Sequence, residues 1–124
     1  MELNPYPDFF PEGVPPGDAE DAHGDAYRLV VNNPPSESDF YAYHLDKRPP
    51  VPKPGRSDCG TSMFRSLEGI SLMKEASKPL RNRQIAYGSL EPEFGKVSKE
   101  RARDSHFDAW LRTNTGIENK FKVI

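Results

Sequence analysis

The sequence predicts a small α+β domain, in which one or two helices pack on a mostly antiparallel sheet of about four strands. An extended, proline-rich N-terminal arm is expected to precede this domain. The chain has 124 residues, which is enough for one domain. Eleven of its 13 prolines lie before residue 55, so regular structure is expected mainly after that point. Short alternating segments indicate strands, and one segment has helical spacing.

Residues 1–26 form the predicted arm and residues 27–124 the predicted domain. The arm has five prolines, seven acidic residues and no Lys or Arg, so its net charge is −7. The domain has 12 acidic residues against 17 basic ones, a net charge of +5. The arm's composition disfavours helix and sheet. Its aromatic residues indicate a segment that binds something, either the chain's own basic domain or another protein.

Two strands are expected in the first half of the domain. Residues 27–32 form a short segment with β-branched side chains, and the Asn-Pro-Pro that follows it ends any pairing with a neighbouring strand. Residues 38–46 are rich in aromatic side chains, which suit a half-buried strand. Residues 47–57 contain four prolines and four basic residues and are expected to form a stiff connector.

Residues 66–78 are predicted to form a helix. Apolar residues recur with helical spacing from Leu67 to Met73, and Ser66 can cap the helix start. Gly69 inside the helix costs about 1 kcal/mol relative to alanine. We therefore expect close packing at that turn.

The rest of the domain contains two expected strands and one segment with two interpretations. Residues 83–90 and 120–124 alternate as strands do, and the second is expected at a sheet edge. Residues 98–113 fit a helix, which we prefer because no β-branched residue occurs before Thr113. The alternative is a strand over residues 105–111.

Composition and motifs exclude several classes of function. No apolar stretch is long enough to cross a membrane. One cysteine and three histidines are too few for a self-contained zinc site, so neither a metal nor a cofactor is expected. Glycine-rich phosphate loops and a nucleophile elbow are absent. A single thiol and the lack of a secretion signal predict a cytoplasmic protein.

Four residues are the candidates for catalysis: His44, Ser62, Arg65 and His106. Histidine titrates near neutral pH and can act as a base or bind an anion. His106 and Asp108 would share a face of a strand but not of a helix. An enzyme is favoured if the four candidates meet in one cavity.

Cys59 has two interpretations. It precedes the predicted helix and has basic neighbours, so its thiol pKa could be lowered and the thiolate could act as a nucleophile. The alternative is a buried, unreactive cysteine that fills a small space.

A resemblance to a known family rests on residues 40–68. The segment Gly60–Glu68 (GTSMFRSLE) has the pattern of a polar turn, followed by a short apolar stretch and the start of a helix. Together with the aromatic segment Phe40–Leu45, it resembles the Ser/Thr-containing strand and following helix of small ADP-ribosyltransferase-type folds. The resemblance implies an enzyme that acts on a nucleotide. No residue of this chain is assigned to the late glutamate of those families.

These observations predict two alternative functions, a binding function and an enzymatic one, and we prefer the binding function. The protein is expected to be an interaction protein (an accessory, inhibitor or immunity-type module) that binds another protein or a second copy through its arm and basic body. Candidate binding residues are Tyr6, Phe9, Phe10, Arg81, Arg83 and Arg101. The alternative is a small enzyme that acts on a nucleotide or phosphorylated group. Acidic residues interleave with the basic ones between positions 74 and 103, which argues against nucleic acid as the partner.

Overall fold

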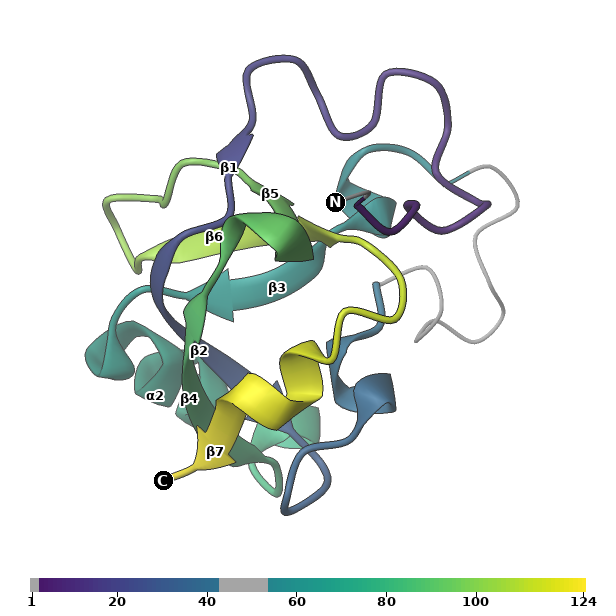
Figure 1. The fold of residues 1–124 in the computed structure, drawn as a ribbon. Coiled ribbons are helices and arrows are strands. Elements are labelled where there is room, and N and C mark those ends of the chain that lie inside the picture. Colours follow the sequence, from purple (N-terminus) through teal and green to yellow (C-terminus); the bar gives the residue numbers. More distant parts are fainter. Residues whose placement is uncertain (1–2, 43–53) are drawn as a thin grey trace.

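The computed structural model describes residues 3–42 and 54–124, which form a seven-stranded antiparallel sheet (Figure 1). Its strand order is β1-β5-β6-β3-β2-β4-β7. The strands are β1 (Glu20–Asp21), β2 (Gly24–Val30), β3 (Thr61–Phe64), β4 (Gln84–Leu90), β5 (Gly95–Val97), β6 (His106–Leu111) and β7 (Phe121–Val123). The described residues contain one α-helix, α2 (Leu67–Ala76). The α+β class is therefore confirmed.

Short 3-10 helices connect several of these elements. They are η1 (Glu37–Phe40), η2 (Ser57–Cys59), η3 (Lys78–Leu80), η4 (Pro92–Phe94) and η5 (Ile117–Lys120). No helix among the described residues has the length and apolar character that crossing a membrane requires.

The expected number of about four strands is wrong, because the sheet has seven. Three of the additional strands, β1, β3 and β5, have only two, four and three residues. Such segments are too short to show alternation in a sequence. We expected residues 61–64 to form a turn and a short apolar stretch, but they are paired with β6 over their whole length.

The strands expected over residues 27–32, 83–90 and 120–124 are present as β2, β4 and β7. β2 pairs with β4 from Gly24↔Leu90 to Val30↔Gln84, so residues 24–26, assigned to the arm by sequence, belong to a central strand. β7 lies at one end of the strand order, as expected of an edge strand. Its Phe121 is buried and the next residue, Lys122, is exposed.

The helix preferred for residues 98–113 is wrong, and the strand alternative is correct. Ser105 has φ 63°, in the left-handed region, which interrupts a helix immediately before β6. β6 is then paired on both sides, with β3 and with β5. Its Phe107, Ala109 and Leu111 are buried on one face of the sheet. Pairing with distant strands thus outweighs the local helix preference.

The strand expected over residues 38–46 is also wrong for its described part, which forms η1 and a short extended segment. The Asp39 carboxylate closes the turn after β2. It accepts hydrogen bonds from the backbone N–H of Val31 (2.8 Å) and of Ser36 (2.9 Å). Residues 43–46 lie outside the described residues, as do residues 47–53 of the expected connector.

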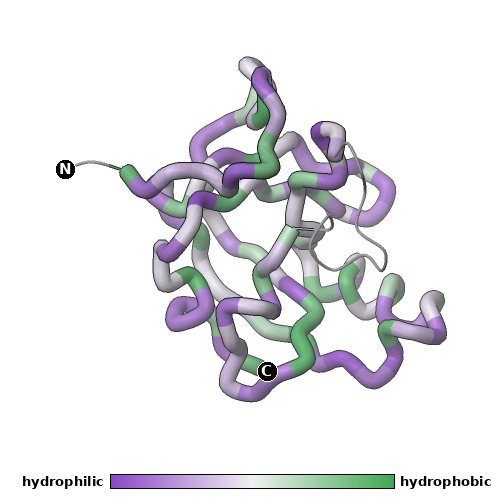
Figure 2. Tube along the Cα trace, turned by 90° about the vertical axis from the view of Figure 1, so that its right-hand side faces the viewer, coloured by the Kyte–Doolittle hydropathy of each residue, from purple (hydrophilic) through white to green (hydrophobic). Residues whose placement is uncertain are grey.

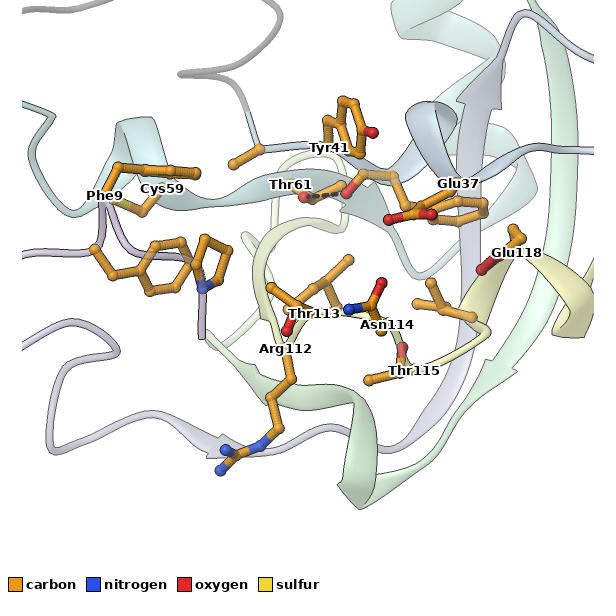
Figure 3. A pocket seen from close by; sticks show the side chains of 16 residues that line it. Phe9, Glu37, Tyr41, Cys59, Thr61, Arg112, Thr113, Asn114, Thr115 and Glu118 are labelled. Atoms are coloured by element: carbon orange, nitrogen blue, oxygen red, sulfur yellow. Dashed lines mark hydrogen bonds between the residues drawn. The ribbon is translucent and has the colours of Figure 1, made fainter. Parts of the chain in front are cut away.

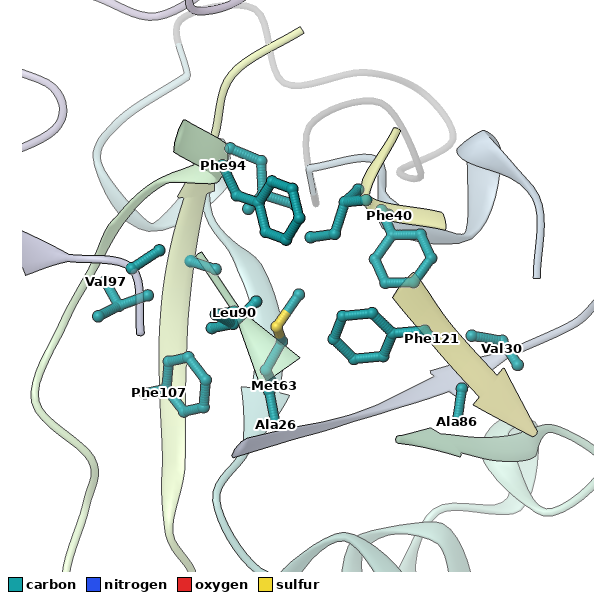
Figure 4. Close-up of a cluster of buried hydrophobic side chains, with 14 residues drawn as sticks. Ala26, Val30, Phe40, Met63, Ala86, Leu90, Phe94, Val97, Phe107 and Phe121 are labelled. Atoms are coloured by element: carbon teal, nitrogen blue, oxygen red, sulfur yellow. The ribbon is translucent and has the colours of Figure 1, made fainter. Parts of the chain in front are cut away.

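The buried apolar side chains form two clusters, one on each face of the sheet. The larger contains aromatic residues from several elements, and Figure 4 shows Phe40, Met63 and Phe121 facing one another in it. The rings of Phe40 and Phe121 lie 5.0 Å apart. The smaller cluster is formed by Leu29, Phe64 and Ile70, between the sheet and α2. Hydrophilic residues are frequent along the outer loops (Figure 2).

Helix α2 confirms the prediction for residues 66–78. The Ser66 hydroxyl caps the helix by accepting a 3.0 Å hydrogen bond from the N–H of Gly69. Gly69 packs directly on the loop before β6, and a Cβ there would overlap the carbonyl oxygen of Asp104. The close packing expected at this glycine is therefore present.

The start of the arm is hydrogen-bonded to the chain's own domain. The Asn4 side chain donates to the carbonyls of Thr113 and Asn114, both at 2.9 Å. Thr113 N–H donates to the Pro5 carbonyl at 2.9 Å. The Arg112 guanidinium lies over the Tyr6 ring, 4.3 Å from its centroid. Of the two partners considered for the arm, the structure shows contacts with the chain's own domain.

Candidate functional site

Ser62 and His106 are brought together by the pairing of β3 and β6. In this antiparallel register Ser62 lies opposite Asp108, and Phe64 lies opposite His106. Alternate residues of a strand share a face, so Ser62, His106 and Asp108 lie on the same side of the sheet. Nε2 of His106 lies 3.1 Å from Oγ of Ser62, within hydrogen-bond distance.

Beside Ser62 the sheet opens, because β2 and β3 pair only at Tyr27↔Phe64. Arg28, which is 9% exposed, occupies this opening. Its Nη1 donates to the Ser62 carbonyl at 2.8 Å, and its Nε donates to the Asp39 carbonyl at 2.9 Å. A buried cation therefore fixes the backbone that carries the Ser62 hydroxyl.

Ser62 and His106 line a cavity of about 530 Å³, which we name the Ser62 cavity. Its lining residues are Arg28, Leu29, Tyr41, Gly60, Ser62, Phe64, Met73, Leu80, Arg83, Arg101 and His106. Four apolar side chains, one each from β2, β3, α2 and η3, thus face six polar or charged residues. The volume is within the range of small-molecule sites.

The charged groups of the Ser62 cavity are cationic, since no described carboxylate lines it. Arg101 is paired with Asp104 through hydrogen bonds of 3.1 and 2.7 Å. The Arg83 side chain has neither a hydrogen bond nor an ion pair with a described residue. Arg28, Arg83 and Arg101 are thus the charged residues of its described lining, and Asp104 offsets the charge of Arg101. The three arginines favour an anionic ligand that accepts hydrogen bonds.

The protonation states suit proton transfer. Burial lowers the pKa of His106, against the opposing effect of the Asp108 carboxylate. The imidazole is therefore neutral near neutral pH, and Nε2 can accept the Ser62 proton in the appropriate tautomer. Burial raises the pKa of Asp108. No hydrogen bond joins the two described side chains of Asp108 and His106, so the arrangement is a Ser–His pair with a nearby carboxyl group.

The sequence-predicted residues are only partly brought together. Arg83 and Arg101 line the Ser62 cavity, but Arg81 instead donates to the Glu75 carbonyl at 3.0 Å. His44 lies outside the described residues.

Arg65 does not line the Ser62 cavity. Its Nη1 donates to the carbonyls of His23 and Asp25, at 2.7 and 2.8 Å. The guanidinium also lies 4.1 Å from the centroid of the Phe107 ring. Arg65 therefore joins the strand β2 region to the core face of β6, away from Ser62.

Sequence reasoning missed Arg28. The available signal was a single charged residue inside the apolar segment YRLVV, since a buried charge in a core strand requires partners.

Cys59 is fully buried, and burial raises its thiol pKa, with the Asp58 charge acting in the same direction. The hypothesis of a lowered pKa is therefore wrong. The alternative interpretation, a buried and unreactive cysteine, agrees with the structure.

A second cavity, of about 340 Å³, lies between the N-terminal arm and the end of β6 (Figure 3); we name it the arm cavity. Figure 3 shows Phe9 at one end and the carboxylates of Glu37 and Glu118 at the other, with Asn114 between them. The remaining lining residues are Pro7, Phe10, Phe40, Tyr41, Ala42, Cys59, Thr61, Leu111, Arg112, Thr113, Thr115 and Ile117. This cavity joins the predicted binding residues Phe9 and Phe10 to the domain.

No group of three or more His, Cys, Asp or Glu residues that could hold a metal ion occurs within residues 3–42 and 54–124. The ADP-ribosyltransferase resemblance implies an aromatic strand, then a Ser/Thr-containing strand and a helix. β3 and α2 supply the last two in that order, but the described part of the aromatic segment, residues 40–42, is not a strand. Comparison of the chain with family models, with curated proteins and with solved structures finds no match.

Proposed function

We propose that the protein is a small enzyme that acts on a phosphorylated compound, such as a nucleotide, in the Ser62 cavity. The observation that carries this proposal is the 3.1 Å contact between Ser62 Oγ and His106 Nε2 inside a cavity lined by three arginines. A hydroxyl next to a neutral imidazole can become a nucleophile. The arginines supply the donors that phosphate oxygens accept.

In the proposed reaction, Ser62 Oγ attacks the phosphorus of a phosphate ester. The Oγ–P bond forms and the P–O bond to the leaving group breaks. His106 Nε2 takes the Ser62 proton and returns it to the leaving oxygen. Water then hydrolyses the phosphoserine. Arg83 and Arg101 bind the non-bridging oxygens, and the Arg28 hydrogen bond to the Ser62 carbonyl holds the nucleophile in place.

The interaction function preferred from the sequence stays a prediction. We rank it second because the arm aromatics that suggested it are half-buried against the chain's own domain. The expected cytoplasmic location and the expected lack of a nucleic-acid partner are likewise predictions.

The test measures binding and turnover separately. Inorganic phosphate is titrated and followed by NMR shifts of the His106 imidazole, and p-nitrophenyl phosphate is assayed for release of p-nitrophenolate. We expect Ser62→Ala to reduce turnover about a thousandfold while phosphate still binds. We expect Arg83→Met with Arg101→Met to reduce phosphate affinity at least about tenfold. Arg81→Met is the matched control, because Arg81 lies outside the cavity.

Two results contradict the proposal. Phosphate that shifts no signal of the Ser62 cavity rules out the anion site. Turnover that is unchanged in Ser62→Ala excludes Ser62 as the nucleophile.

A further inference from the structure

The N-terminal arm forms a wall of the arm cavity. Pro7, Phe9 and Phe10 line it, and the hydrogen bonds from Asn4 and to Pro5 hold this part of the arm against residues 112–114. The arm aromatics thus enclose a space of about 340 Å³, within the range of small-molecule sites. The acidic, aromatic-rich arm thus contributes to a cavity within its own chain, and no second protein is needed to form it.

The charge that faces this cavity is negative. Glu37 and Glu118 line it, and neither carboxylate has a hydrogen bond or ion pair with a described residue. Arg112 is the remaining charged residue of the described lining. Its Nη1 donates to the Asn4 carbonyl at 2.8 Å, and its guanidinium stacks on Tyr6. Figure 3 shows this guanidinium pointing away from the two glutamates.

Four residues of the lining are aromatic. Phe9, Phe10, Phe40 and Tyr41 contribute rings from the arm and from the η1 segment. Aromatic rings attract organic cations through their negative faces, and carboxylates pair with ammonium groups. Asn114, between the glutamates and Phe9 in Figure 3, adds an amide that can donate or accept.

We propose that the arm cavity binds an organic ammonium compound with an aromatic or aliphatic body, its cation facing Glu37 and Glu118. The arm cavity differs from the Ser62 cavity in the sign of the net charge of the residues that line it. The two cavities share Tyr41 as a lining residue, but the ligand proposed for each has the opposite sign. The proposal therefore does not depend on the proposed enzyme activity.

The experiment uses the full chain and two probes of nearly the same shape. Phenethylamine carries the cation, and 2-phenylethanol replaces the ammonium by a neutral hydroxyl. We expect phenethylamine to bind at least about tenfold more tightly in calorimetric or NMR titrations. We also expect phenethylamine to shift the backbone amide signals of residues 113–118 and of the arm.

Variants then separate the contributions. Glu37→Gln with Glu118→Gln is expected to remove the preference for the amine, and Phe9→Ala to weaken both probes. Asp8→Asn is the matched control, because it removes one charge from the arm at a residue that does not line the cavity. Ser62→Ala is expected to leave phenethylamine affinity unchanged.

Three outcomes overturn the proposal: equal affinity of the two probes for the wild-type chain, shifts confined to the Ser62 cavity, or loss of amine binding in Asp8→Asn as large as in the double glutamine variant. The first comparison needs no variant, so it remains decisive if a substitution prevents folding.

Discussion

Nη1 of Arg28 donates a 2.8 Å hydrogen bond to the carbonyl oxygen of Ser62, at the point where the pairing between β2 and β3 stops. In a continued ladder, that carbonyl would receive a backbone N–H. Arg28 therefore replaces a missing strand partner. It does so beside the candidate nucleophile, so stability and site geometry depend on the same side chain.

Replacing Arg28 should destabilise the fold. Arg28→Met leaves the carbonyls of Ser62 and Asp39 without their donors, and we expect the free energy of unfolding to fall by about 3 kcal/mol. Arg28→Lys should lose less, since an ammonium can reach one of the two oxygens. Urea unfolding measures both. Arg81→Met, at an exposed position, should change stability by less than about 0.5 kcal/mol. Equal losses in Arg28→Met and Arg81→Met would contradict the bridging role.

His106 should make stability depend on pH. Burial lowers its pKa in the folded chain, so the unfolded chain binds the proton more readily. The free energy of unfolding should then decrease as pH falls from about 6.5 toward the folded pKa. Urea midpoints between pH about 7.5 and about 5.5 measure this slope. We expect His106→Gln to flatten it, whereas His23→Gln, at an exposed position, should retain it. The same slope in both variants would show that another group is responsible.

Gly69→Ala should destabilise the protein although alanine favours helices by about 1 kcal/mol. A methyl group would collide with the Asp104 carbonyl and approach the Ser105 hydroxyl, so helix α2 must move away from the loop before β6. We expect a net loss of about 2 kcal/mol in thermal or urea unfolding. Glu75→Ala, on the exposed side of the same helix, is the control and should stay within about 0.5 kcal/mol. A stabilised Gly69→Ala would show that this contact is loose.

Asp39 should contribute stability that acid removes. Burial alone would raise its pKa, but hydrogen bonds from Ser36, Val31 and Asn32 outweigh burial and lower the pKa below its ordinary value. Stability from this carboxylate is therefore present above pH about 3.8 and lost as the pH falls through the folded pKa. We expect Asp39→Ala to cost about 3 kcal/mol at neutral pH. The difference from wild type should shrink in acid, while the exposed control Asp18→Ala should cost little at any pH. A difference that does not change with pH would mean that the charge is unimportant.

Local signals predicted the elements that depend on local interactions. Helix α2 has its cap, its spacing and its tightly packed glycine within a few residues of one another, so all three could be read from the sequence. The strand at β6 was only the second interpretation of residues 98–113, because its conformation depends on β3 and β5, which are distant in sequence, and on the left-handed Ser105 before it. A single sequence carries no record of such pairings.

The candidate site was predictable by residue type but not by position. Ser62 and His106 could be named as chemically capable residues, yet their contact exists only because β3 and β6 pair in one register. A shift by one residue would turn the hydroxyl or the imidazole to the other face. For the same reason Arg65, three positions after Ser62, could not be separated from the site before the structure was known.

The single cysteine of the chain is useful for spectroscopy because Cys59 has no exposed surface. Maleimide and methanethiosulfonate reagents require an accessible thiolate, so the native protein should not react with them. Cysteines introduced at Val31 and Leu72, which are 63% and 58% exposed, would then be the sole labelled positions. Spin labels at these two points can report the distance between the end of β2 and helix α2 without first preparing a cysteine-free background.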